Sequence, residues 1–375
     1  MDAEQTSTNS DSLADAMRLA MISGVGPRLR KALLEEFGSA AAVLAAAPAD
    51  LRQVPGIGAE LTRRIALART EIDVQAEMDR CAAEGISILA ESRPEYPRSL
   101  REIHDPPGIL FVRGEIRPTD ALAVAIVGSR HATHYGLTMA ERLAGSLARS
   151  GITVVSGLAR GIDGAAHRGA LAAGGRTLAV LGSGLANIYP PEHAELAAEV
   201  AKSGAVISEM PPDSPPVGGA FPQRNRIISG LSLGVLVVEA STNSGALITA
   251  RHAMEQGREV YAVPGRIDNR LSRGCHRLIR DGAKLVETVD DILEELGPLV
   301  APTQSDDGVM VHHPAELLLN EIEQQVLAKI TGEPTTIDAV VIASGLPISQ
   351  VLSTISVLEM RHIIRRISGN LIARP

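Results

Sequence analysis

The sequence predicts an α/β protein with a Rossmann-like, parallel, doubly wound sheet as its core. We expect an all-α helix-hairpin-helix or SAM-like domain before this core and a small winged-helix domain after it. Three observations predict the arrangement. Short apolar segments alternate with amphipathic helical stretches in the middle of the chain, which is typical of a parallel sheet covered on both faces. A near-repeat of glycine turns lies before this region, and a polar, aperiodic segment follows it.

At 375 residues the chain is long enough for two or three domains. The composition shifts predict five parts. They are a disordered N-terminus at 1–11, a helical domain at 12–76, the Rossmann-like domain at 77–296, a linker at 297–313 and the winged-helix domain at 314–375.

The near-repeat in the N-terminal part consists of Ser-Gly-Val-Gly at 23–26 and Pro-Gly-Ile-Gly at 55–58, each followed by a helical stretch. This pattern is typical of paired helix-hairpin-helix units, whose turns present amide donors to a phosphate at a helix N-terminus. Basic residues follow both turns, at 28, 30, 31, 63 and 64. The alternative is a helical bundle that uses glycine only for close packing.

The central region begins with a helix at 72–83 and two expected edge strands at 86–89 and 109–112. The strands expected in the parallel sheet are 123–127, 152–156, 177–181, 205–208, 235–239 and 259–263. The helices expected between them are 138–150, 164–173, 191–203 and 244–256.

The C-terminal part reads as three helices at 317–329, 336–343 and 349–359, with a hairpin formed by 362–367 and 370–374. Three helices and a hairpin make a winged helix. The third helix contains no Lys or Arg, so it is a poor reader of the major groove. A protein-contact or regulatory module is the alternative to a DNA-binding one.

The bulk charge opposes a polyanionic ligand, because the net charge is −8 at pH 7. Residues 122–230 nevertheless hold nine Lys and Arg against seven Asp and Glu. Aromatic residues make up 2% of the chain and Trp is absent. If the ligand is nucleic acid, phosphate contacts must therefore supply most of the affinity, with little base stacking.

Two cysteines, Cys81 and Cys275, stand far apart without partners at metal-ligand spacing, which argues against a disulfide framework and a zinc site. The first residues are polar and acidic, and no stretch offers about 18 uninterrupted apolar residues. We expect a cytoplasmic protein with no membrane segment.

Glycine-rich loops follow three of the predicted strands: Gly-Ser-Arg at 128–130, Gly-Leu-Ala-Arg-Gly at 157–161 and Gly-Ser-Gly at 182–184. In such loops an anion approaches the backbone amides, and Arg130 and Arg160 add donors suited to phosphate oxygens. Neither the dinucleotide fingerprint of dehydrogenases nor a phosphate-binding loop of ATPases is present. A fourth basic element, Phe-Pro-Gln-Arg-Asn-Arg at 221–226, stands at the start of a predicted helix.

Several long segments resemble the DNA-processing protein A (DprA, or Smf) family, in family order. They are Ala-Ile-Val-Gly-Ser-Arg at 125–130, Ser-Gly-Leu-Ala-Arg-Gly-Ile-Asp at 156–163, Phe-Pro-Gln-Arg-Asn-Arg-Ile-Ile-Ser-Gly-Leu at 221–231 and Glu-Ala-Ser-Thr-Asn-Ser-Gly-Ala-Leu-Ile-Thr-Ala at 239–250. The resemblance implies a protein that binds and protects single-stranded DNA and forms a homodimer through its Rossmann-like domain. It also implies a role in loading the RecA recombinase during natural transformation.

The resemblance further implies which residues contact DNA. The Gly-Ser-Arg motif gives Gly128, Ser129 and Arg130, the Arg-Asn-Arg motif gives Arg224, Asn225 and Arg226, and Phe221 is a stacking candidate. From their positions in the loops we add Gly157, Arg160, Gly161, Ser244 and Gly245. Family members often hold a Lys or Arg in the loop before the second motif, whereas this chain has Pro-Pro-Val at 215–217. We expect no catalytic residue, metal or cofactor.

Four side chains near these loops have alternative interpretations. Arg160 and Asp163 either contact the ligand or pair with each other or with Arg168 to hold the second loop. Glu239, at a strand end, is either a general base or, as we prefer, a carboxylate that caps a helix or orders a loop. His167 is expected to be packed or capping rather than catalytic.

Two other functions compete with DNA binding. A nucleotide-processing enzyme such as a phosphoribohydrolase would use the glycine loops and Glu239, but its Pro-Gly-Gly-x-Gly-Thr loop is absent. A protein adaptor, in which the terminal domains bind the partner, is the third hypothesis.

Overall fold

The computed structural model describes residues 13–296, 303–304, 310–311, 313, 316, 319–360 and 363–374. The expected disordered N-terminus at 1–11 and most of the expected linker lie outside these residues. At the centre is a nine-stranded sheet in the order β1-β2-β6-β5-β4-β3-β7-β8-β9. Its strands are β1 Ile86–Ala90, β2 Ile109–Gly114, β3 Ala123–Gly128, β4 Thr153–Ser156, β5 Thr177–Leu181, β6 Ala205–Ser208, β7 Gly234–Val238, β8 Glu259–Ala262 and β9 Lys284–Leu285.

The strand order confirms the doubly wound core. Strands β3 to β6 step outward one by one in parallel, and β7 returns to pair with β3 on its other side. The two predicted edge strands pair antiparallel with each other, and β2 also pairs antiparallel with β6. Because the chain reverses its direction of travel beside β3, the loops after β3 and β7 diverge and leave a crevice at the carboxyl ends of the strands.

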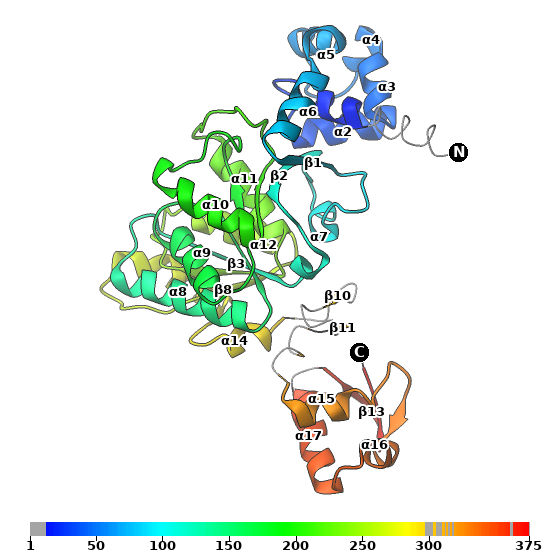
Figure 1. Ribbon diagram of the computed structural model, residues 1–375, viewed down its shortest axis with the longest axis vertical. Helices are drawn as coiled ribbons and strands as arrows, with labels where there is room; N and C mark the ends of the chain where they lie inside the picture. The colour runs from blue at the N-terminus through cyan, green and yellow to red at the C-terminus, as the bar shows by residue number, and fades with distance from the viewer. Residues whose placement is uncertain are drawn as a thin grey trace.

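Helices cover both faces of the sheet (Figure 1), and the alternation of side chains along β3 shows how. Ala123, Ala125 and Val127 pack toward α11 (Ala220–Gly230), α12 (Ala246–Glu255) and α13 (Arg273–Arg280). Val124 and Ile126 pack toward α8 (His134–Arg149) and α9 (Ile162–Ala172). A third cluster places α10 (Ala194–Ser203) against β2, β5 and β6. Strands buried on both faces therefore explain the continuous apolar segments of the sequence.

The N-terminal helices form a small bundle of their own around Leu33, Val43, Leu51 and Ile65. After a helix that includes residues 13–21, the elements are α2 Pro27–Phe37, α3 Ala40–Ala45, α4 Pro48–Leu51, α5 Ala59–Glu71 and α6 Val74–Ala83. Gly24 and Gly56 turn the two hairpins with φ of 99° and 93°, in the left-handed region that favours glycine. The paired hairpins are as predicted.

Several of the basic residues of this bundle have partners within the protein. Arg30 forms an ion pair with Glu91, and Lys31 donates to the carbonyl of His104 at 3.0 Å. These two contacts attach the bundle to the connection between β1 and β2. Arg64 donates to Glu60 and to the Ser23 carbonyl, each at 3.0 Å. Structural contacts thus account for three of the basic residues that follow the glycine turns.

The C-terminal residues form the expected winged helix around Val326, Val340, Val351 and Ile355. Its elements are α15 Glu321–Leu327, α16 Ile337–Ser344 and α17 Ile348–Met360, with a sheet of β12 Thr335–Thr336, β14 Leu371–Ala373 and β13 Arg365–Ser368. In the described part of the chain no single helix has the length and hydropathy to cross a membrane. The pair α16 and α17, bent by 118°, meets that test only when the two are taken together.

The structure describes part of the expected linker. Within 297–313, β10 (Thr303–Gln304) pairs antiparallel with β11 (Met310–Val311). Val311 is 3% exposed and belongs to the cluster that includes α8 and β7. This part of the segment forms paired strands, and Val311, one of several apolar residues within 297–313, packs against the core. The remaining short helices are α7 Arg98–Arg101, η1 Pro118–Ala121, η2 Pro191–His193, η3 Arg270–Ser272 and α14 Asp290–Leu293.

Candidate functional site

A pocket of about 660 Å³ opens at the carboxyl ends of the strands, where β3 and β7 lie side by side. We call it the rim pocket. Segments that are far apart in the sequence form it: the loop after β3, the loop after β4, the start of α11 and the start of α12. Eight of the predicted site residues line it, namely Gly128, Ser129, Arg130, Phe221, Arg224, Asn225, Ser244 and Gly245.

The remaining four predicted residues lie elsewhere. Gly157 and Arg160 line a small adjoining hollow that shares Arg130, Phe221 and Arg224 with the rim pocket. Gly161 lines neither cavity, although it packs directly beneath the Gly-Ser-Arg loop. Arg226 lines neither cavity as well.

Arg130 is the exposed cation of the rim pocket. Its guanidinium carbon lies 5.4 Å from the centre of the Phe221 ring, within the range of a cation–π contact. Among the described residues, Arg130 has no carboxylate within ion-pair distance. Its planar set of donors is therefore available to a phosphate-bearing ligand.

Glu239 holds the loop that carries Arg130. The Glu239 carboxylate accepts from the amide of Thr133 at 2.7 Å, from the Thr133 hydroxyl at 2.5 Å and from Asn269 Nδ2 at 3.3 Å. Thr133 in turn accepts from the Gly136 amide and caps α8. Glu239 is only 3% exposed and has a φ of 53°. These contacts favour the loop-ordering interpretation over a general base, because the carboxylate oxygens are already engaged.

The second glycine loop supports the first from below. Gly161 has a φ of 73°, and a Cβ there would overlap the carbonyl of Ser129. The Ile162 amide donates to that same carbonyl at 3.2 Å. Only a glycine fits this approach of two backbones, so Gly161 positions the Arg130 loop rather than the ligand.

Of the two interpretations of Arg160 and Asp163, the structure does not support the one in which they pair with each other or with Arg168. Arg160 is exposed and forms an ion pair with Glu192, at the start of η2. Asp163 is buried and accepts from the amides of Gly157 and Ala159 at 3.2 and 3.4 Å. Burial raises the pKa of Asp163, and the neighbouring Arg224 opposes that shift. Asp163 therefore organises its own loop.

Arg224 lies in the floor of the rim pocket and is 6% exposed. Its Nη1 donates to the Gly157 carbonyl at 2.8 Å and to the Val180 carbonyl. It thus joins the ends of β4 and β5 under the pocket. Burial lowers the pKa of Arg224 to about 10, so the guanidinium is still charged at neutral pH. Its charge makes the electrostatic potential at the floor of the rim pocket more positive. The adjacent Asn225 donates to the Gly245 carbonyl at 3.3 Å.

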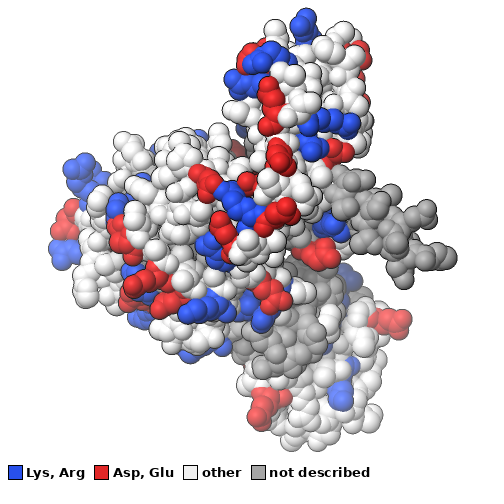
Figure 2. Space-filling model, turned by 45° about the horizontal axis from the view of Figure 1, so that its top comes forward, with Lys and Arg blue, Asp and Glu red and all other residues white. Residues whose placement is uncertain are grey.

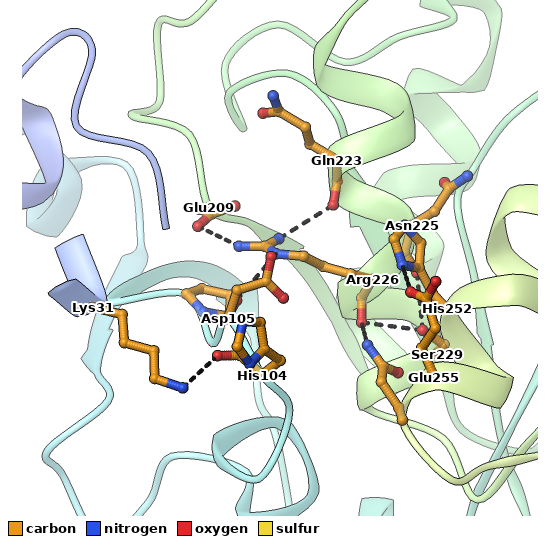
Figure 3. A network of polar contacts seen from close by, with 12 residues as sticks. Lys31, His104, Asp105, Glu209, Gln223, Asn225, Arg226, Ser229, His252 and Glu255 are labelled. Atoms are coloured by element: carbon orange, nitrogen blue, oxygen red, sulfur yellow. Dashed lines mark hydrogen bonds and ion pairs between the residues drawn. The ribbon is translucent and has the colours of Figure 1, made fainter. Parts of the chain in front are cut away.

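The assignment of Arg226 as a DNA contact needs correction. Its side chain is 4% exposed and points toward Asp105 and Glu209 (Figure 3), neither of which lines the rim pocket. It forms ion pairs with Asp105 at 3.3 Å and with Glu209 at 2.8 Å. A buried cation with two carboxylate partners stabilises the packing of α11 against the 105–109 connection. The sequence did not reveal this role because both carboxylates come from other segments.

Tyr189 is a residue that the sequence analysis did not single out. It lines the rim pocket, and its ring centre lies 5.5 Å from that of Phe221 with the planes inclined by 49°. The signal was available, because Tyr189 is an aromatic residue a few positions after the third glycine loop. Tyr189, Phe221 and Arg130 together form a partly exposed aromatic and cationic surface at the mouth of the pocket.

His167 is buried beneath this region, as expected for a packed histidine. The Thr177 hydroxyl donates to the Val154 carbonyl, so it accepts from Nδ1 of His167 at 2.7 Å. Nδ1 therefore carries a proton. Burial lowers the pKa of His167 to about 3.

Charge is mixed over much of the surface. In Figure 2 basic and acidic side chains alternate across the visible face rather than gathering in separate regions. The described residues contain no group of three or more His, Cys, Asp or Glu arranged to hold a metal ion. An anionic ligand in the rim pocket would therefore be attracted by the nearby charges of Arg130 and Arg224 rather than by the net charge of the protein.

Three family models match the chain in order. They describe a SAM-like helix-hairpin-helix tandem at 16–70, the DNA recombination-mediator protein A at 87–297 and the DprA winged helix domain at 312–370. The second model alone covers more than half of the residues, including every residue of the rim pocket.

Curated relatives agree with these matches. The protein Smf of Escherichia coli is 44% identical over 277 residues, which are 73% of this chain and 74% of that protein. The protein Smf of Synechocystis is 33% identical over 93% of this chain and 96% of that protein. The DNA processing protein DprA of Bacillus subtilis is 44% identical over 57% of this chain and 72% of that protein.

Two solved structures are similar in fold and sequence. The DNA processing protein A of Streptococcus pneumoniae matches with a TM-score of 0.68 and 36% identity, over 76% of this chain and 98% of that chain. A structure of DNA processing protein A from Helicobacter pylori, described for its single-stranded DNA binding mode, matches with a TM-score of 0.50 and 31% identity. That match covers 55% of this chain and 93% of that chain.

Proposed function

From the premise that the chain belongs to the DprA/Smf family, we propose that it binds single-stranded DNA in the rim pocket. The proposal assigns the sugar–phosphate backbone to Arg130 and the neighbouring amides of the Gly-Ser-Arg loop. Phe221 and Tyr189 receive a base at the mouth of the pocket. Arg224 acts from the floor through its charge.

One observation carries the proposal: four segments that bear the family motifs converge on one pocket, with an exposed arginine over an aromatic ring. This arrangement suits a ligand that has both a phosphate and a flat base. The single-stranded DNA binding mode named for the Helicobacter pylori relative supports the same class of ligand.

The test is the binding of labelled single-stranded and double-stranded oligonucleotides to wild type and to Arg130→Glu, measured by fluorescence anisotropy. A charge-assisted hydrogen bond contributes about 1.5–3 kcal/mol, so we expect a loss of affinity of about 10- to 100-fold for the single strand. Arg117→Glu is the matched control, because Arg117 is exposed and precedes β3 at the opposite end of the sheet. Equal affinity of wild type and Arg130→Glu would refute the assignment.

We also propose that the protein acts by binding alone. The relatives are named as DNA processing proteins, and the engaged carboxylate of Glu239 offers no free base for a nucleotide-processing reaction. Release of a free base from mononucleotides, lost in Glu239→Gln, would contradict this proposal.

Three finer proposals rest on the family resemblance. They are a homodimer formed through the Rossmann-like domain, loading of the RecA recombinase onto the bound strand in natural transformation, and a cytoplasmic location. Sedimentation of the purified chain tests the first. RecA filament formation on DNA coated with a single-strand binding protein, with and without this chain, tests the second. Fractionation of the source cells tests the third.

A further inference from the structure

A second hollow, of about 590 Å³, lies between α8 and α9, which pack side by side on one face of the sheet (Figure 1). We call it the α8–α9 groove. Three arginines stand at its sides, Arg142 and Arg149 from α8 and Arg168 from α9. None of them belongs to the rim pocket.

The floor of the groove consists of backbone and small side chains. A Cβ on Gly169 would overlap the carbonyl of Glu141, and a Cβ on Gly145 would lie 3.2 Å from the carbonyl of Gly169. The two helices therefore approach each other closely through glycine. The long side chains lie at the sides of the groove, and its walls are therefore formed by the guanidinium groups of the three arginines. The groove is open to solvent on the side away from the sheet.

The arginines of the groove are weakly neutralised. Arg142 donates to the backbone carbonyl of Glu287 at 3.2 Å, and Arg149 donates to the Ser146 hydroxyl at 3.0 Å. Neither has a carboxylate within ion-pair distance among the described residues. Arg168 lies 3.9 Å from Glu141, at the limit of an ion pair between half-exposed groups. Three neighbouring cations with one carboxylate favour an anion that carries several oxygens.

The groove lies on two helices that begin beside the loops of the rim pocket. Helix α8 begins just after the Arg130 loop, and α9 begins just after Arg160 and Gly161. Both helices lead away from the rim. At about 1.5 Å per residue, Arg168 lies about 9 Å from the start of α9, and Arg149 about 22 Å from the start of α8. An extended chain that leaves the rim pocket past Arg130 and follows these helices reaches the groove.

We propose that the α8–α9 groove binds the sugar–phosphate backbone of the single strand where it extends beyond the rim pocket. An acidic peptide is the less suitable ligand, because the groove offers neither an aromatic nor a large aliphatic residue to hold a peptide side chain. The same absence of aromatic rings leaves the bases of the strand unstacked and facing solvent, so this part of the site does not read sequence.

The proposal rests on the proposed function, and oligonucleotide length separates the two. The experiment compares oligonucleotides of about six and about twenty nucleotides, binding to wild type and to the double variant Arg142→Gln/Arg149→Gln over a range of salt concentrations. We expect about tenfold weaker binding of the long strand to the variant, and equal binding of the short one. The slope of log affinity against log salt should become shallower by about 0.7 for each lost phosphate contact.

Arg98→Gln/Arg117→Gln is the matched control, because it removes two exposed arginines that lie away from the groove and changes the net charge equally. Unchanged affinity and salt slope for the long strand in the groove variant would overturn the proposal. Equal losses on short and long strands would overturn it too, since the effect would then come from the rim pocket. Displacement of the long strand by poly-glutamate from wild type, but not from the groove variant, would assign the groove to an acidic peptide. If wild type binds neither oligonucleotide, the proposed function itself fails.

Discussion

The Arg130 loop and helix α11 carry arginines that the sequence presents in the same way, yet the structure uses them differently. Arg130 is exposed beside Phe221 and has no carboxylate partner among the described residues. Arg226 is almost fully buried between Asp105 and Glu209. A motif therefore predicts where arginines gather, whereas burial and partners decide which arginine meets a ligand. The comparison separates arginines that stabilise the fold from arginines that are available to bind a ligand.

The largest effect that sharpens this comparison is expected at Arg226. Arg226→Ala leaves two carboxylates without their cation, and breaking a buried pair costs about 3–5 kcal/mol. Because both partners are partly exposed, we expect the lower end, about 3 kcal/mol, in the free energy of unfolding measured with urea. Arg130→Ala should change that free energy by no more than about 0.5 kcal/mol. A stable Arg226→Ala protein that no longer binds DNA would reverse the two roles.

The next effect concerns pH and the buried His167. Its pKa is lowered to about 3 from an ordinary value of 6.5, so below pH 6.5 the unfolded chain takes up a proton that the folded protein excludes. The contribution of the neutral, buried His167 to the free energy of unfolding is therefore complete above pH 6.5. This contribution falls by about 1.4 kcal/mol per pH unit as the pH drops toward 3. His167→Gln should flatten this part of the stability curve in urea titrations, and an unchanged slope would contradict the assignment.

A smaller effect is expected at the aromatic pair. Phe221→Ala should weaken binding of a single strand by about 1–3 kcal/mol, the usual contribution of one stacked base. An abasic oligonucleotide should bind wild type and Phe221→Ala alike. Tyr189→Trp introduces the sole Trp of the chain, and its fluorescence should change on addition of DNA. An abasic strand that still distinguishes Phe221→Ala from wild type would argue against stacking.

The smallest effect is expected when the charge of Arg130 is kept and its shape is changed. Arg130→Lys retains the cation but loses the planar fork that matches phosphate oxygens, so affinity should fall by about 1 kcal/mol. Anisotropy titrations at one salt concentration measure the change. The same substitution at Arg168, half-exposed beside Glu141, should alter the affinity for a short strand by less. Identical effects at the two positions would mean that charge alone matters.

The core was predictable because both faces of the sheet are buried and the apolar segments are therefore continuous. The strand β5 coincides with its predicted range, and the edge strands β1 and β2 are where they were expected. Helix α8 begins four residues earlier than predicted, because Glu239, more than a hundred residues away, orders its capping Thr133. Long-range contacts of this kind leave no local signal.

The same reason explains what was missed in and around the site. Tyr189 and Phe221 meet only in the folded protein, and the carboxylates that bury Arg226 come from two other segments. Helix α13 was not predicted, since five of its eight residues are Arg, His or Gly and its apolar face consists only of Cys275, Leu278 and Ile279. Loop composition identified the rim pocket, but which loop residues face it depends on packing.

The attachment of Val311 to the core limits how far the winged helix can travel. Only the residues between Val311 and Leu319, which packs in the winged-helix core, connect the two bodies. Eight residue steps span at most about 28 Å when fully extended. If the chain were unattached to the core from residue 297 onward, the winged helix could lie much farther from the core. Leu319 can therefore lie no farther than about 28 Å from Val311, so a partner bound by the winged helix would be held close to the core of the same molecule.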